Sequence, residues 1–219
     1  MTEQMPPAIG RRHLLGSCIS AAGALAMSGC SNSPSKPSPG TPGAPTAEAA
    51  PVTAPEDLMR EHGVLKRVLL IYREGIGHLR AGEQTPTEAL NSGARIIRRF
   101  IEDYHEKLEE QYVFPSLEKA SKLADLTGVL RIQHERGRLL TDRVLAATSG
   151  AAASDQPARD ALAQDMLTFI RMYEPHEARE DTVIFPALRD VMSVREFRDL
   201  AETFEDEEHR RFGQEVSNE

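Results

Sequence analysis

The stretch His-Glu-Lys-Leu-Glu at residues 105–109 recurs as His-Glu-Ala-Arg-Glu at residues 176–180. Outward from these stretches, a lone histidine precedes each copy: His62 comes before the first and His134 before the second. The lone histidines are 72 positions apart, and the two His-x-x-x-Glu pairs are 71 positions apart. The sequence therefore contains two similar halves, each with one lone histidine and one histidine–glutamate pair.

These side chains predict a site for two metal ions held between helices. Residues four positions apart lie on the same helix face, so the histidine and glutamate of one pair can reach the same site. A carboxylate can also bridge two ions. The six candidate ligands are His62, His105, Glu109, His134, His176 and Glu180. Mixed nitrogen and oxygen donors favour two carboxylate-bridged iron ions, with manganese or zinc as alternatives.

The alternative is that these histidines are ordinary core residues. A single histidine on an apolar helix face is more often a buried residue with a hydrogen-bond partner than a ligand. Here four histidines fall on four expected helices, and two of them have the same glutamate four positions later, which favours the metal site. His78 and His209 have no counterpart in the other half and are left outside it.

Several neighbours of the candidate ligands have two interpretations. Gly137 and Thr141 follow His134 on the same face, and either leave a cavity for an exogenous ligand or allow close helix packing. Tyr112 either points into the pocket or belongs to the core. The glutamates that directly follow the paired histidines, at positions 106 and 177, either orient a ligand or are solvated.

A second shared motif follows each pair. Residues 113–117, Val-Phe-Pro-Ser-Leu, match residues 184–188, Ile-Phe-Pro-Ala-Leu, and the proline stands ten residues after the histidine in both halves. Because proline removes a backbone donor and clashes with the preceding turn, both helices are expected to bend or end there. Pro175 also predicts a kink or bulge just before His176.

Composition and periodicity predict an all-α fold. Aromatic residues make up 5% of the chain and tryptophan is absent. Apolar residues recur every three or four positions in four expected helices, at about 55–79, from 85 past Tyr112, at 123–147 and at 156–191. A fifth helix is expected at about 193–212. Capping boxes are predicted at 85–88 and 193–196. We expect an antiparallel up-down-up-down four-helix bundle over 55–192, formed by a duplicated helical hairpin, and a short C-terminal helix and tail over 193–219.

The N-terminal segment has the features of an export signal. Residues 10–15 contain a twin arginine, and the apolar run from Leu14 to Met27 has 14 residues, which is too short to span a bilayer comfortably. Met27-Ser28-Gly29-Cys30 resembles a lipobox, although a plain secretory signal is the alternative. We therefore expect residues 1–29 to be a signal peptide and Cys30 to carry lipid, which places the protein outside the cytoplasm on a membrane anchor.

The segment that follows has the composition of a tether. Seven prolines lie between Ser31 and Pro55, among small and polar residues. Residues 30–54 are therefore expected to form a disordered linker. Removing residues 1–29 would change the formal charge from −8 to −9, since Arg11, Arg12 and Glu3 are lost. This charge argues against binding to nucleic acid and against electrostatic adhesion to anionic lipid.

The motif His … His-x-x-x-Glu … His … His-x-x-x-Glu resembles that of the hemerythrin-like, or HHE cation-binding, family over residues 55 to about 192. The resemblance implies a four-helix bundle with a carboxylate-bridged non-haem di-iron centre that binds oxygen or related molecules. It also implies that the six candidates are the ligands. The oxygen carriers of the family have a further histidine one turn after that of the third helix, where this chain has Arg138. This departure argues against reversible oxygen transport.

Two functions follow as expectations. The first is a membrane-tethered di-iron protein that binds or reduces oxygen, peroxide or nitric oxide and receives electrons from an unknown donor. The second is a non-enzymatic module that binds iron or senses oxidants through a partner.

Overall fold

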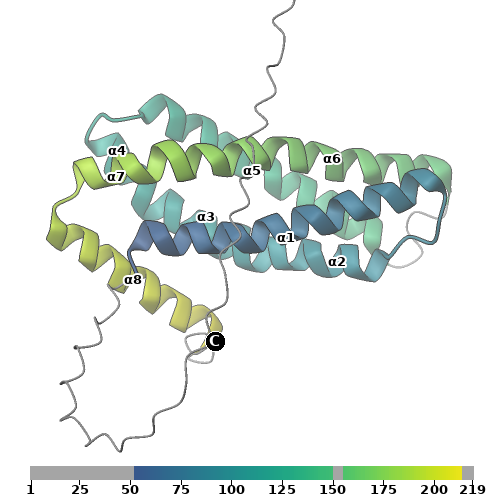
Figure 1. Cartoon of the computed structure of the whole chain (residues 1–219), viewed down its shortest axis with the longest axis horizontal. Helices are drawn as coiled ribbons and strands as arrows, with labels where there is room; N and C mark the ends of the chain where they lie inside the picture. Colours follow the sequence, from purple (N-terminus) through teal and green to yellow (C-terminus); the bar gives the residue numbers. More distant parts are fainter. Residues whose placement is uncertain (1–51, 150–154, 214–219) are drawn as a thin grey trace, which may run out of the picture. The chain divides into compact units, whose positions relative to one another are not determined.

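The described part of the chain is entirely helical. The computed structural model describes residues 52–149 and 155–213, and no strand occurs among them (Figure 1). This confirms the predicted all-α class. The predicted signal peptide, the lipobox and most of the predicted linker lie outside the described residues. In the ranges that are described, none of the helices is both long enough and apolar enough to cross a membrane.

Four helical rods and one further helix make up this part of the chain. Rod 1 is α1 (Ala54–Ala81) and rod 3 is α5 (Ala124–Thr148). Rod 2 runs through α2 (Thr87–Ile96), the π-helical η1 (Ile97–His105), α3 (Glu106–Leu108), the π-helical η2 (Glu109–Val113) and α4 (Phe114–Lys119). Rod 4 runs through α6 (Gln156–Arg179), the π-helical η3 (Glu180–Ile184) and α7 (Phe185–Val191), and α8 (Val194–Phe212) follows it.

The structure confirms one of the two capping boxes predicted from the sequence. The capping box predicted before α8 is confirmed: the Glu196 carboxylate accepts from the backbone N–H of Ser193, and the Ser193 hydroxyl accepts from that of Glu196. The box predicted at residues 85–88 is wrong, because α2 begins at Thr87 after Pro86 without a side-chain cap. Thr53 instead forms a capping box with Glu56 at the start of α1.

Both helices were expected to bend or end at Pro115 and Pro186, and neither rod ends there, because α4 and α7 continue past these prolines. The π-helical η2 and η3 begin at Glu109 and Glu180, and in each the N–H five residues later, of Phe114 or Phe185, donates to the glutamate carbonyl. A wider turn moves the backbone away from the proline ring that follows and lets the helix continue. A kink or bulge was predicted just before His176, and no bulge is present there, since α6 stays α-helical through Pro175. The irregular segment lies in the other half, as η1.

The rods pack around a common core as a helical bundle. α1 contacts α2 and α6, and α5 contacts the same two helices, so the contacts form a closed cycle. α8 packs against α1 (Figure 1). Its buried Leu200 and Phe204 extend the core. Burial of each such large apolar side chain stabilises the fold by about 1.5–3 kcal/mol.

The core consists of two apolar clusters with polar side chains between them. Leu58 of α1 belongs to one cluster and Leu65 to the other, and His62 lies between them along the helix. His134 has the corresponding place on α5, between Leu130 and Leu140. The candidate ligands therefore occupy a buried layer that apolar side chains shield from water.

Candidate metal centre

The structure brings all six predicted ligands together in two groups. The first ligand group is His62, His105 and Glu109, and the second is His134, His176 and Glu180. Within each group the possible ligand atoms lie within 4.8 Å of one another. Every side chain in both groups is buried, at 0–2% exposure. Each group has the size and composition to hold one cation.

The two carboxylates connect the two groups. Oε2 of Glu109, in the first group, is 3.5 Å from Nε2 of His134 in the second. Oε2 of Glu180, in the second group, is 3.5 Å from Nε2 of His62 in the first. Each glutamate thus faces histidines of both groups, which is the position of a bridging ligand.

The buried donors fit a pair of cations. All four carboxylate oxygens of Glu109 and Glu180 are buried without a hydrogen-bond partner. Nε2 of His134 and Nε2 of His176 face each other at 3.1 Å. Buried polar atoms are normally paired, because an unpaired one costs about 1–3 kcal/mol, and more when it is charged. Two cations would satisfy these nitrogen and oxygen atoms together.

Burial and neighbouring charges set the protonation of this layer. Burial and the charge of Glu180 raise the pKa of Glu109. Burial opposes ionisation of Glu180 as well, but His176 and the other histidines beside it lower its pKa. Burial disfavours protonated His62, yet its hydrogen bond to Asp181 and the negative charge of Glu180, 3.5 Å from Nε2, raise its pKa to about 10. A cation that binds His62 therefore has to displace a proton.

An outer layer of acceptors orients all four histidines. Each Nδ1 lies at hydrogen-bond distance from a side-chain oxygen, which leaves Nε2 free to face the centre. The pairs are His62 with Asp181 at 2.8 Å, His105 with Glu61 at 2.7 Å, His134 with Glu110 at 3.1 Å and His176 with Gln133 at 3.0 Å. These contacts fix the orientations of the four rings.

Sequence reasoning missed these four outer residues, although the repeat contains them. Glu61 and Gln133 directly precede the two lone histidines, so they have the same spacing of 72. Glu110 and Asp181 directly follow the two ligand glutamates, with the same spacing of 71. The repeated unit is thus one residue longer on each side than the ligand motif.

Arg138 is turned toward acidic side chains. Its guanidinium donates to Glu106 and Glu110, both at 2.6 Å, and the Tyr173 hydroxyl also donates to Glu106 at 2.6 Å. Glu106 is 1% exposed and Glu177 is 4% exposed, so the interpretation of either as solvated is wrong. Arg138 neutralises acidic groups beside the centre and offers no nitrogen lone pair to it.

The cavity interpretation of Gly137 and Thr141 is wrong. The Tyr173 side chain occupies the space beside Gly137, where an added Cβ would lie 2.0 Å from its hydroxyl oxygen. Thr141 donates to the buried carboxylate of Glu102 at 2.5 Å. These small residues permit close packing, which was the alternative interpretation.

Replacing Gly137 with alanine should destabilise the protein by about 1–3 kcal/mol, because the new methyl group overpacks against a buried ring. This sign is opposite to the stabilisation by about 1 kcal/mol that alanine gives at an unconstrained helix position. Chemical denaturation measures the difference. Tyr173→Leu in the same chain should recover part of the loss, and a stable Gly137→Ala variant would contradict the contact.

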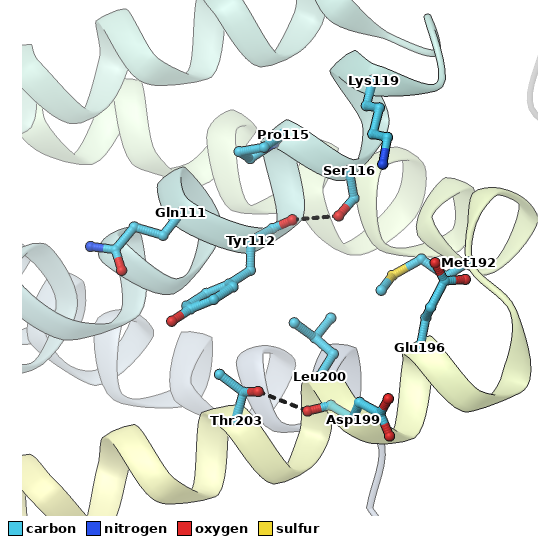
Figure 2. Close-up of a pocket in the computed structure, with 10 residues that line it drawn as sticks. All are labelled: Gln111, Tyr112, Pro115, Ser116, Lys119, Met192, Glu196, Asp199, Leu200 and Thr203. Atoms are coloured by element: carbon cyan, nitrogen blue, oxygen red, sulfur yellow. Dashed lines mark hydrogen bonds between the residues drawn. The ribbon is translucent and has the colours of Figure 1, made fainter.

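Tyr112 lies outside the candidate centre. It lines a surface pocket of about 360 Å³ between α4 and α8, together with Leu200 and Thr203 (Figure 2). Its ring packs against Phe204 at 6.0 Å between centroids. None of the six candidate ligands lines this pocket. The interpretation of Tyr112 as part of the packing around the core agrees with this position.

Glu102 should make stability depend on pH. Burial raises its pKa to about 7, although the hydrogen bond from Thr141 works in the opposite direction. A carboxyl group with a raised pKa stabilises the fold fully at pH values below its pKa in the unfolded chain. It loses that contribution as the pH rises through its pKa in the folded protein. Glu102→Gln should therefore reduce the fall in stability between pH 4.5 and 8 by about 3 kcal/mol. The free energy of unfolding of the unmodified protein and of Glu102→Gln, measured across this pH range, tests the prediction. Parallel plots of the two free energies against pH would contradict it.

Comparison with known proteins agrees with this geometry. The model of the hemerythrin HHE cation-binding domain matches residues 53–188. Uncharacterized proteins of Mycobacterium bovis and Mycobacterium tuberculosis are 70% identical to the chain over 214 residues, which cover 98% of this chain and 84% of each relative. No solved structure matches the chain. The family match spans both ligand groups, and the chain belongs to the hemerythrin HHE cation-binding domain family.

Proposed function

We propose that this protein holds a carboxylate-bridged, non-haem di-iron centre that binds or reduces oxygen, peroxide or nitric oxide. The observation that supports this most is the pair of buried glutamates, whose four oxygens have no hydrogen-bond partner. They lie among four histidines whose Nε2 atoms face them. Such a layer destabilises a protein unless it binds cations.

The six candidates would hold the metal, with Glu109 and Glu180 shared between the two ions. Bound iron would supply Lewis acidity and one-electron chemistry. The chain itself does the rest. The outer acceptors hold each imidazole with Nε2 inward, and the rings of Phe114 and Phe185, which stack on His134 and His62, exclude water.

Arg138 supports ligand binding or reduction over reversible oxygen transport. The position that supplies an additional histidine in the oxygen carriers holds a guanidinium paired with Glu106 and Glu110. The ion in the second ligand group would therefore have one protein donor fewer than the corresponding ion of the oxygen carriers. An incompletely ligated ion can accept an exogenous small molecule.

Metal analysis and ligand spectra test this function. Protein purified without chelator should contain two metal ions per chain, mainly iron. The oxidised protein should bind azide or peroxide, and the reduced protein should oxidise rapidly when mixed with oxygen in stopped flow. A folded protein with almost no bound metal would refute the centre. A long-lived reversible oxygen adduct would instead favour transport or storage.

The second candidate function is a non-enzymatic iron-binding or oxidant-sensing module that acts through a partner. The complete burial of both ligand glutamates fits this function as well as the first, because bound iron would be shielded from water in either case. Turnover of peroxide with an added reductant separates the two functions, since only the first predicts many cycles per chain.

We further propose an antiparallel up-down-up-down bundle tethered outside the cytoplasm by lipid on Cys30. The cyclic packing of the rods supports the bundle. The twin arginine, the short apolar run and the lipobox support the anchor. Mass spectrometry of the native N-terminus tests this, and an unmodified Cys30 in membrane-extracted protein would refute it. Unchanged export after Arg11→Lys with Arg12→Lys would refute the twin-arginine route.

A further inference from the structure

The outer layer repeats the symmetry of the ligands except at one pair of positions. Glu110 and Asp181 are equivalent residues, and both present a carboxylate to the Nδ1 of a lone histidine. Glu61 and Gln133 are equivalent as well, and each faces the paired histidine of its own half. One of them is a carboxylate and the other is an amide.

This difference changes what the two histidines can donate to a metal. A carboxylate that accepts the Nδ1–H of an imidazole can share its proton, which moves negative charge onto the ring and makes Nε2 a stronger donor. An amide oxygen accepts a hydrogen bond but does not take up the proton. His105, which faces Glu61 at 2.7 Å, is therefore the stronger donor, and His176, which faces Gln133 at 3.0 Å, is the weaker.

The other pair of acceptors adds to the same asymmetry. Glu110 is also bound by Arg138 and Lys107, both at 2.6 Å, and these cations reduce the charge that it presents to His134. Besides His62, Asp181 faces Lys66, whose amine is 4.0 Å away and whose side chain is 56% exposed. Both histidines of the second ligand group thus have the weaker outer partner.

We propose that Glu61 and Gln133 are positioning residues that make the two bound ions unequal. The first ligand group holds its ion tightly, and the second holds a more labile and more Lewis-acidic ion, to which a small exogenous anion binds. This rests on the proposed dinuclear centre. It assigns the place of ligand binding to one half and attributes it first to the difference between Glu61 and Gln133, and second to the cations that bind Glu110.

Reciprocal substitutions test the proposal in the iron-loaded full chain. Chelator should remove iron from the unmodified protein in two phases of one ion each. Gln133→Glu should slow the faster phase about tenfold, and Glu61→Gln should speed the slower phase by a similar factor. Gln164→Glu, the same change at an exposed position of α6, should leave both phases unaltered.

Spectroscopy provides readouts that a purely structural effect would not move. Mössbauer spectra of the unmodified protein should show two iron environments of equal area. Gln133→Glu should bring them closer together and weaken azide binding about tenfold, because stronger donation lowers the Lewis acidity of the second ion. Unfolding of the metal-free variants shows whether each still folds.

The outcomes separate the inference from the function on which it rests. Less than two bound metal ions per unmodified chain would refute the dinuclear centre itself. Two ions that leave in a single phase, with no response to Gln133→Glu in a folded chain, would overturn the asymmetry and leave the centre intact. A faster phase that responds only to Glu61→Gln would place the labile ion in the other half and would also overturn the proposal.

Discussion

Glu109→Gln should remove bound metal and at the same time stabilise the metal-free protein by about 1–3 kcal/mol at pH 7. The side chain is fully buried, neither oxygen is hydrogen-bonded, and burial together with Glu180 raises its pKa. A carboxyl group with a raised pKa stabilises the fold at pH values below its pKa in the unfolded chain, and it loses that contribution as the pH rises through its pKa in the folded protein. Ionised Glu109 is therefore unfavourable in the absence of a cation. Glutamine keeps the shape and removes the charge.

Glu180→Gln is the matched comparison. It should also remove metal, but it should not stabilise the metal-free protein, because Glu180 is paired with histidines that lower its pKa. Elemental analysis measures the first effect and chemical denaturation of metal-free protein measures the second. Full metal content in Glu109→Gln, or equal stability changes in the two variants, would contradict the assigned roles.

Arg138→Gln should lower the free energy of unfolding by about 3 kcal/mol. The substitution removes the cationic partner of Glu106, which is 1% exposed and would keep only the Tyr173 hydroxyl. Breaking a buried ion pair from one side leaves an uncompensated charge, and this costs more than the pair itself contributes.

Arg143→Gln is the control on the same helix. Arg143 is 60% exposed and lies 3.3 Å from Asp165, so its loss should cost less than about 1 kcal/mol. Denaturant unfolding of both variants tests the contrast. Equal effects at the two positions would show that Arg138 contributes only a surface charge.

The six candidate ligands could be found from the sequence because helical periodicity and the repeat both identify them. Spacing places His105 and Glu109 on one helix face, and a second copy 71 positions later repeats the arrangement. The all-α class follows from the same periodicity. The structure is all-helical over the described residues and brings the six side chains together, because the spacing within each pair and the helical periodicity are both local. Their role as ligands stays a prediction.

The remaining features depend on contacts between helices. Sequence left two interpretations of Gly137, a cavity or close packing, and the space beside it is filled by Tyr173, which lies on another rod. The π-helical turns at Glu109 and Glu180 precede prolines past which both rods continue, so neither helix ends where the proline rule allows an end. The outer acceptors were visible as an extension of the repeat, but their partners are set by the packing. The N-terminal anchor stays a prediction.

The pattern of outer hydrogen bonds also bears on how such a chain can evolve. Glu61 binds a histidine of its own half, whereas Glu110 and Asp181 bind histidines of the opposite half. Neither half therefore contains the outer partners of all its own histidines. A single helical hairpin could complete these contacts only by pairing with a second copy of itself. Two identical copies must carry the same residue at equivalent positions. Once the halves are joined in one polypeptide, positions 61 and 133 can carry different residues. The two sides of the centre can then differ as well.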